Sequence, residues 1–269
     1  MCTLIIGREI LGPRTVVIAA NRDEDPGRPS DPPRVLIERP RVVGGRDRRA
    51  GGTWLAIRER LAAVALLNRR DDTGRDAGPT PERRSRGLLT LEVAAAEDDP
   101  RTPRVGSPSD LSGAALASAR RALAETRYAP FSLVFVAPEA CWALLHYPGC
   151  QPRVVDISPG WHALTHADLD DLEEPRTAWL LADLAGWRPP TLEEAERGLI
   201  ERLAEHEAGG NPRAAVCIHD GRMVTVSSSL LFLAPDRASY RHAEGRPCEQ
   251  PFLDCSALLS GERPALEKA

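Results

Sequence analysis

The sequence TVVIAANRDE, residues 15–24, joins an apolar β-like run to four polar residues. A second apolar run, residues 3–6, precedes it, and a Gly-Pro pair between the two is a turn signal. Two short apolar runs separated by a turn predict a β-hairpin. In such a hairpin the end of the second strand lies beside the start of the chain, so we expect Asp23 close to Cys2.

The rest of the chain contains strands and helices in separate blocks. We expect strands at residues 42–43, 53–57 and 61–67, helices at 87–97 and 111–127, strands at 131–137, 141–146, 153–157 and 161–165, helices at 175–187 and 191–207, and strands at 214–218, 223–233 and 239–242. This segregation predicts an α+β fold with antiparallel sheets. Two antiparallel sheets packed face to face, with helices on both outer sides, account for the number of elements.

Residues that favour helix N-termini, and glycine and proline residues that interrupt helices, give further predictions about these elements. Ser85 is a predicted N-cap, and Thr191 with Glu194 has the spacing of a capping box. Residues 25–40 contain too many breakers for a helix. The glycine pairs at 44–45 and 51–52 are interpreted as turns that let sheet edges bend, although such pairs also form anion-binding nests.

Composition limits the class of protein. The chain has 269 residues and a net charge of −4, which argues against a general electrostatic grip on nucleic acid or on an anionic membrane. No stretch approaches the ~18 apolar residues of a membrane span. We predict a single domain over residues 1–269, a flexible loop near 71–84, a loose C-terminal tail and a cytoplasmic location. The near absence of lysine is typical of a GC-rich bacterial source.

The six cysteines are expected to be reduced, and their spacing contains no CxxC pair. His162 and His166 lack a third ligand, and Cys217 and His219 are interpreted as core and rim residues of one strand. We therefore predict no metal site.

Cys2 directly follows Met1, and methionine before a small residue is the usual substrate for its removal. Processing would leave the Cys2 thiol and a free α-amine on adjacent carbon atoms. With a pKa of about 7.7–8.0, that amine can act as the general base for the thiol. A carboxylate to hold the amine and donors for an oxyanion would complete such a site.

The first 90 residues hold six motifs in order. They are Met1-Cys2, Asn21-Arg22-Asp23-Glu24, Gly44-Gly45-Arg46-Asp47, Gly51-Gly52-Thr53-Trp54-Leu55, Leu67-Asn68 followed by Arg70, and Ser85-Arg86-Gly87. This series resembles the NRDE family, also called the transport and Golgi organisation 2 family. The resemblance implies a four-layer αββα sandwich of the N-terminal nucleophile hydrolase-like type, related to penicillin V acylases and bile-salt hydrolases.

The resemblance also implies roles for single residues. Cys2 would be the nucleophile and its own amine the base, Asp23 would orient that amine, and Arg22 would set the electrostatics of the thiolate. Asn68 would donate to the oxyanion. The other motif residues that the resemblance places in or around the site are Asn21, Glu24, Trp54, Arg86 and His166.

The chain departs from the family pattern at two places. His166, in Leu164-Thr165-His166, stands where members typically carry an asparagine, and Val224-Thr225-Val226-Ser227 lacks the arginine of a Gly-Thr-Arg-Ser segment. A histidine can also donate a hydrogen bond. Arg222 is near this second motif but does not occupy the matching position.

Two functions remain open. The first is a cysteine amidohydrolase or acylase that cleaves a non-peptide C–N bond of a small molecule without a cofactor. The alternative is a non-catalytic binding or trafficking protein that holds haem or a lipid-like ligand in the same fold. The sequence does not predict an oligomeric state.

Overall fold

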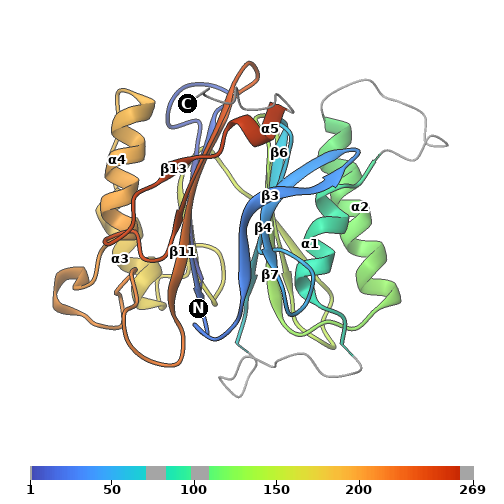
Figure 1. The fold of residues 1–269 in the computed structure, drawn as a ribbon, viewed down its shortest axis with the longest axis horizontal. Coiled ribbons are helices and arrows are strands. Elements are labelled where there is room, and N and C mark those ends of the chain that lie inside the picture. Colours follow the sequence, from blue (N-terminus) through green and yellow to red (C-terminus); the bar gives the residue numbers. More distant parts are fainter. Residues whose placement is uncertain (1, 71–82, 98–108, 261–269) are drawn as a thin grey trace, which may run out of the picture.

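The computed structural model describes residues 2–70, 83–97 and 109–260. Two antiparallel sheets lie face to face, and a pair of helices covers the outer face of each (Figure 1). The predicted four-layer αββα sandwich is therefore confirmed. Within these residues, no helix is both long and apolar enough to cross a membrane.

The first sheet contains the N-terminal hairpin at its centre. Its order is β10-β1-β2-β11-β12-β13. The strands are β1 (Thr3–Arg8), β2 (Val16–Glu24), β10 (Gly160–Leu164), β11 (Val224–Leu233), β12 (Ala238–Glu244) and β13 (Leu253–Asp254). The register pairs Thr3 with Asn21, so the end of β2 lies beside the start of the chain as predicted.

The second sheet follows the chain order except for the helices inserted between β6 and β7. Its order is β3-β4-β5-β6-β7-β8-β9. The strands are β3 (Ser30–Glu38), β4 (Arg41–Asp47), β5 (Leu55–Arg58), β6 (Ala62–Asn68), β7 (Phe131–Val136), β8 (Cys141–His146) and β9 (Arg153–Asp156).

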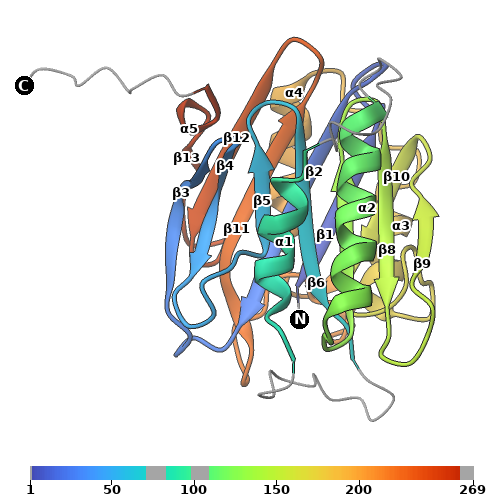
Figure 2. The same cartoon turned by 90° about the vertical axis from the view of Figure 1, so that its right-hand side faces the viewer.

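Helices α1 (Arg86–Ala94) and α2 (Ser109–Glu125) cover the second sheet, and α3 (Pro175–Leu184) and α4 (Leu192–Leu203) cover the first (Figure 2). A short 3-10 turn, η1 (Ala208–Gly210), follows α4, and α5 (Ala257–Ser260) ends the described chain. The helices α1, α3 and α4 end three or four residues earlier than predicted. Ser85 precedes α1, but its side chain makes no capping hydrogen bond, whereas Thr191 caps α4.

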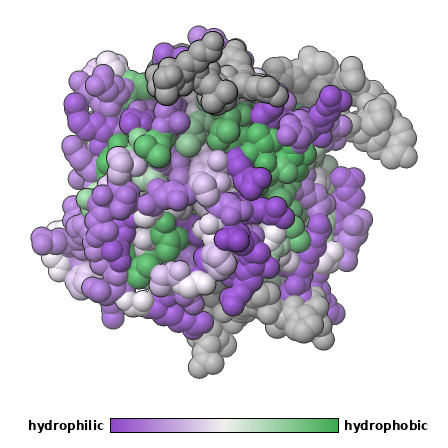
Figure 3. Space-filling view, viewed as in Figure 1, coloured by the Kyte–Doolittle hydropathy of each residue, from purple (hydrophilic) through white to green (hydrophobic). Residues whose placement is uncertain are grey.

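Apolar side chains fill all three spaces between the layers. In β1, Leu4 and Ile6 face the space between the sheets, whereas Ile5 faces α3 and α4. Both faces of the central strands are thus buried, which explains their continuous apolar runs. Hydrophilic residues predominate on the outside, and on the face seen in Figure 3 the hydrophobic residues gather toward the middle of the molecule.

Three predictions about strands need correction. The first is β3, which lies in the proline-containing segment 25–40 that was given no strand. Pro32 and Pro33 are tolerated because β3 is an edge strand, where proline removes no hydrogen bond to a further neighbour. The second is residues 214–218, which form an irregular loop and no strand. Their amides bond elsewhere: Val216 and Cys217 both donate to the carbonyl of Glu205.

The third correction concerns Gly44-Gly45, which lie inside β4 and not in a turn. A Cβ on Gly44 would lie 2.2 Å from the Leu55 carbonyl oxygen, and one on Gly45 would lie 2.4 Å from the Trp54 ring. Close packing therefore explains this pair. Gly51 does adopt a turn conformation, with φ of +77°. The predicted loop and tail lie largely outside the described residues, in 71–82 and 261–269.

Candidate active site

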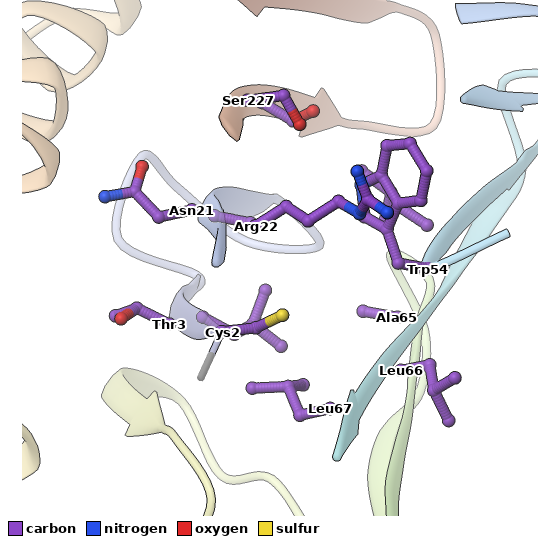
Figure 4. Close-up of a pocket in the computed structure, with 13 residues that line it drawn as sticks. Cys2, Thr3, Asn21, Arg22, Trp54, Ala65, Leu66, Leu67 and Ser227 are labelled. Carbon is purple, nitrogen blue, oxygen red and sulfur yellow. The ribbon is translucent and has the colours of Figure 1, made fainter. Parts of the chain in front are cut away.

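Cys2 lies at the start of β1, and the hairpin register places it beside Arg22. Its thiol points into a small pocket between the two sheets (Figure 4). The pocket has a volume of about 20 Å³, which accommodates about one water molecule. The residues that line it include Cys2, Arg22, Trp54, Leu67, Ser227 and Ser229.

Arg22 places a buried positive charge beside the thiol. Its guanidinium stacks 4.1 Å above the Trp54 ring and donates to Ser30 Oγ at 3.0 Å. Burial raises the pKa of the Cys2 thiol, and the charge of Arg22 works in the opposite direction. The thiol is therefore the favoured form at rest, and a nearby base is needed to produce the thiolate.

Asp23 lies on the opposite face of β2, toward α3. Its carboxylate accepts from Thr225 Oγ1 at 2.7 Å and from Arg176 Nη1 at 3.2 Å. Burial raises the pKa of Asp23, and the Arg176 charge and the Thr225 hydrogen bond counteract that rise. Asp23 thus lies in the part of β2 beside the start of the chain, as predicted, but its carboxylate faces the helices and not the pocket.

A β-bulge in β11 brings two kinds of side chain to this place. Thr225 pairs with Asp23 and Ser227 pairs with Arg22, so Val226 is the extra residue. Without the bulge, Thr225 and Ser227 would share one face, because side chains alternate along a strand. With it, Thr225 reaches the Asp23 carboxylate while Ser227 lines the pocket.

Asn21 and Glu24 have supporting positions. The buried Asn21 amide donates to the carbonyls of Leu203 at 2.8 Å and Val216 at 3.0 Å. It therefore ties β2 to the end of α4. Glu24, which is half-buried, has its carboxylate 3.8 Å from the Arg22 guanidinium. The side chains of the Asn21–Glu24 motif thus alternate between the two faces of β2. Asn21 and Asp23 face the helices, and Arg22 and Glu24 face the other way.

Five of the predicted site residues do not line the pocket: Asp23 and Glu24, described above, and Asn68, Arg86 and His166. Asn68 ends β6, one residue after Leu67, which does line the pocket. Arg86 begins α1 and donates to the Pro130 carbonyl at 2.8 Å, which is a structural contact. His166 follows β10, and its Nδ1 atom finds no hydrogen-bond partner among the described residues. Burial, together with the charge of Arg70, lowers the pKa of His166 to about 4, so its ring is neutral at pH 7.

Sequence reasoning missed two further groups. Arg176, on α3, bridges Asp23 and Thr3 Oγ1, which it contacts at 2.7 Å. His242, on β12, has its Nδ1 atom 3.0 Å from Ser229 Oγ, behind the pocket. Burial, with the charge of Arg22, lowers the pKa of His242 to about 4. Neither residue belongs to a local motif, so only the tertiary fold identifies them.

Comparisons with known proteins agree with this architecture. The family described as Transport and Golgi organisation 2 matches residues 1–207. A C2A mutant of conjugated bile acid hydrolase from Clostridium perfringens has a TM-score of 0.51 at 10% identity, over 98% of this chain and 95% of that chain. At this identity the similarity establishes the fold, which is N-terminal nucleophile hydrolase-like.

Two other solved structures cover similar lengths. An N-acylethanolamine-hydrolyzing acid amidase ortholog from Caenorhabditis elegans has a TM-score of 0.48 at 13% identity, over 86% of this chain and 92% of that chain. Penicillin V acylase from Agrobacterium tumefaciens has a TM-score of 0.46 at 13% identity, over 98% of this chain and 89% of that chain. No curated protein sequence matches the chain.

Proposed function

This chain belongs to the Transport and Golgi organisation 2 family, and we propose that it is an N-terminal-cysteine hydrolase that cleaves a non-peptide amide bond of a small molecule. The observation that carries the proposal is the position of the Cys2 thiol. It faces a pocket between the sheets, with Arg22 beside it and the buried Asp23 directly behind it. Met1 lies outside the described residues, and its removal is part of the proposal.

The mechanism begins with a proton transfer. After removal of Met1, the Cys2 α-amine accepts the thiol proton, and the thiolate attacks the amide carbonyl carbon. The pKa of the thiol is raised by burial, so an adjacent base is required, and the amine is the group bonded closest to it. Asp23 supplies the carboxylate that holds this amine. It lies near the start of the chain because Asn21, two residues earlier in β2, pairs with Thr3.

The second half of the mechanism releases the products. Attack gives a tetrahedral oxyanion, to which Asn68 donates from the end of β6. The C–N bond then breaks, and the protonated α-amine gives its proton to the leaving amine. Water hydrolyses the resulting thioester, with the α-amine again acting as base, and restores the thiol.

The test combines mass spectrometry with variants of the full chain. The intact mass of the cell-made protein should lack Met1, and iodoacetamide at neutral pH should label Cys2. A panel of acyl amides should be turned over by the wild type and by Cys150→Ser, whose exposed thiol lies away from the pocket. Cys2→Ala should reduce turnover to background, and Asn68→Ala should reduce the rate by about 10²–10³-fold.

Two outcomes would overturn the proposal. Retained Met1 removes the α-amine base. Unchanged turnover in Cys2→Ala removes the nucleophile. A shift of the haem Soret band on titration, with no turnover of any amide and no labelling of Cys2, would support the ligand-binding alternative instead.

A further inference from the structure

Two cysteines and two histidines come together beyond the end of α4, away from the pocket. They are His206, Cys217, His219 and Cys248, and their ligand atoms all lie within 4.8 Å of one another. We propose that they bind one Zn²⁺ ion in a tetrahedral Cys₂His₂ site. Three of these four residues lie beyond the segment that matches the family.

The distances fit such a site. With Zn–S bonds of about 2.3 Å and Zn–N bonds of about 2.0–2.1 Å, tetrahedral geometry places two sulfurs about 3.8 Å apart and a sulfur and a nitrogen about 3.6 Å apart. The Cys217 and Cys248 sulfurs lie 3.6 Å apart, and His219 Nε2 lies 3.3 Å from the Cys248 sulfur. The rings of His206 and His219 meet edge to face, with centroids 4.5 Å apart.

A second observation concerns the other nitrogen of His219. Its Nδ1 atom lies 3.6 Å from a carboxylate oxygen of Glu249. Zinc-bound histidines almost always direct their free ring nitrogen to a carboxylate, a carbonyl or water, which orients the ring and makes it a stronger ligand. His219 therefore has Nε2 toward the cluster and Nδ1 toward a carboxylate.

The backbone holds the three ligand-bearing segments together. The carbonyl of Glu205, next to His206, accepts from the amides of Val216 and Cys217. Arg246 donates through Nη2 to the carbonyl of His219 at 3.1 Å, which fixes the turn that carries Cys248. The ligand positions are thus set by the fold, which explains why the spacing of the cysteines gave no sign of a metal.

The chemistry of the ligands selects the ion. Two thiolates and two imidazoles favour a borderline-soft ion such as Zn²⁺ over Mg²⁺ or Ca²⁺, which prefer oxygen ligands. Binding releases the two thiol protons, because thiolates are the ligands. A disulfide is the competing state of the two cysteines, but it requires a sulfur–sulfur distance of about 2.05 Å and leaves the paired imidazoles without a function.

The proposed ion would also stabilise the neighbourhood of Asp23. Ile218 lies between two ligands, and its N–H donates to Thr225 Oγ1 at 2.9 Å. The same hydroxyl donates to the Asp23 carboxylate at 2.7 Å. The ion would therefore hold the loop that positions Thr225, and through Thr225 the carboxylate.

The test measures metal in the full chain, expressed without a polyhistidine tag and purified under reducing conditions. Elemental analysis should find about one zinc ion per chain in the wild type and in the control variants Cys150→Ser and Cys255→Ser. Cys217→Ser and Cys248→Ser should lose the ion. Cobalt substitution should give a thiolate-to-metal charge-transfer band that Cys248→Ser lacks.

Graded variants keep the proposal testable if a cysteine variant fails to fold. Glu249→Gln should retain the fold and bind zinc about 10–100-fold more weakly, because it removes the carboxylate that faces His219 Nδ1 while its amide oxygen can still accept from Arg246, which donates to both Glu249 oxygens at 3.2 Å. Three results would overturn the proposal. They are a metal content near zero after incubation with zinc and dialysis, full metal content in both cysteine variants, and an intact mass that shows a Cys217–Cys248 disulfide in the reduced preparation.

Discussion

The two helix layers cover their sheets with different chemistry. Between the second sheet and α1 and α2, the buried contacts are mainly apolar, as with Leu89 and Ala119, with a neutral hydrogen bond from Trp142 Nε1 to Ser112 Oγ. Between the first sheet and α3 and α4, apolar contacts such as Leu180 are joined by a buried ion pair, Asp23 with Arg176. Folding alone does not require buried charges, because apolar packing at the same place is often at least as stable. The buried charges thus lie at the first sheet, whose strand β2 carries the candidate site residues Arg22 and Asp23.

The largest effect should come from breaking this ion pair. Arg176→Met removes the guanidinium that pairs with the buried Asp23 carboxylate, so we expect the free energy of unfolding to fall by about 3–5 kcal/mol. Urea denaturation measures the change. The double variant Asp23→Asn with Arg176→Met should recover part of the loss, because no uncompensated charge remains. A loss below about 1 kcal/mol in the single variant would contradict the comparison.

The apolar parts of the two layers should behave alike. Leu89→Ala in α1 and Leu180→Ala in α3 each create a cavity at a fully buried position, and each should cost about 3 kcal/mol. Urea denaturation of both variants, at one pH, gives the two values side by side. If Leu180→Ala were far milder than Leu89→Ala, the polar network, and not apolar packing, would dominate the cohesion of its layer.

One residue of the first sheet, His242, should make the stability of the protein depend on pH in the acid range. The pKa of His242 is about 4 in the folded chain, below the ordinary value of about 6.5 expected on unfolding. The unfolded chain therefore binds a proton that the folded chain excludes, and the stability present above pH 6.5 is lost as the pH falls toward 4. We expect a loss of about 2 kcal/mol between pH 7 and pH 5. Stability measured against pH in His242→Gln should show a flatter acid limb.

The smallest expected difference between the two helix layers concerns the N-caps of α1 and α4. Thr191 Oγ1 accepts from the Glu194 N–H at 3.2 Å, whereas Ser85 makes no side-chain capping bond. Thr191→Ala should therefore cost about 1 kcal/mol, and Ser85→Ala less than about 0.5 kcal/mol. Thermal denaturation resolves both changes. Equal losses would show that the difference in capping has no energetic meaning.

Local patterns predicted the elements better than the contacts between them. The hairpin that brings Asp23 toward Cys2 follows from two apolar runs and a turn, and the α+β class with antiparallel sheets follows from the order of the blocks, whereas the αββα layering was implied by the family resemblance. The capping role of Thr191 was likewise visible in the sequence. Each of these features depends on residues that are neighbours along the chain.

The remaining features depend on residues far apart in the chain. Arg176 reaches Asp23 across 153 positions, so no spacing rule connects them. The cluster of His206, Cys217, His219 and Cys248 combines three segments, one of which was predicted as a strand. The need for glycine at positions 44 and 45 also comes from tertiary packing, because Leu55 and Trp54 leave no room for a Cβ atom there. Such contacts require the tertiary structure.

The alternation along β2 means that neighbouring residues of one short motif support different layers of the molecule. Arg22 faces the pocket, whereas Asn21 and Asp23, on either side of it, face the helix layer. A substitution at Arg22 would therefore break the hydrogen bond to Ser30 Oγ and the stacking on Trp54, whereas one at Asn21 or Asp23 would break contacts with the helix layer. A single tetrapeptide thus couples three layers of the sandwich, so a shift of one residue in the register of β2 would disturb all three at once.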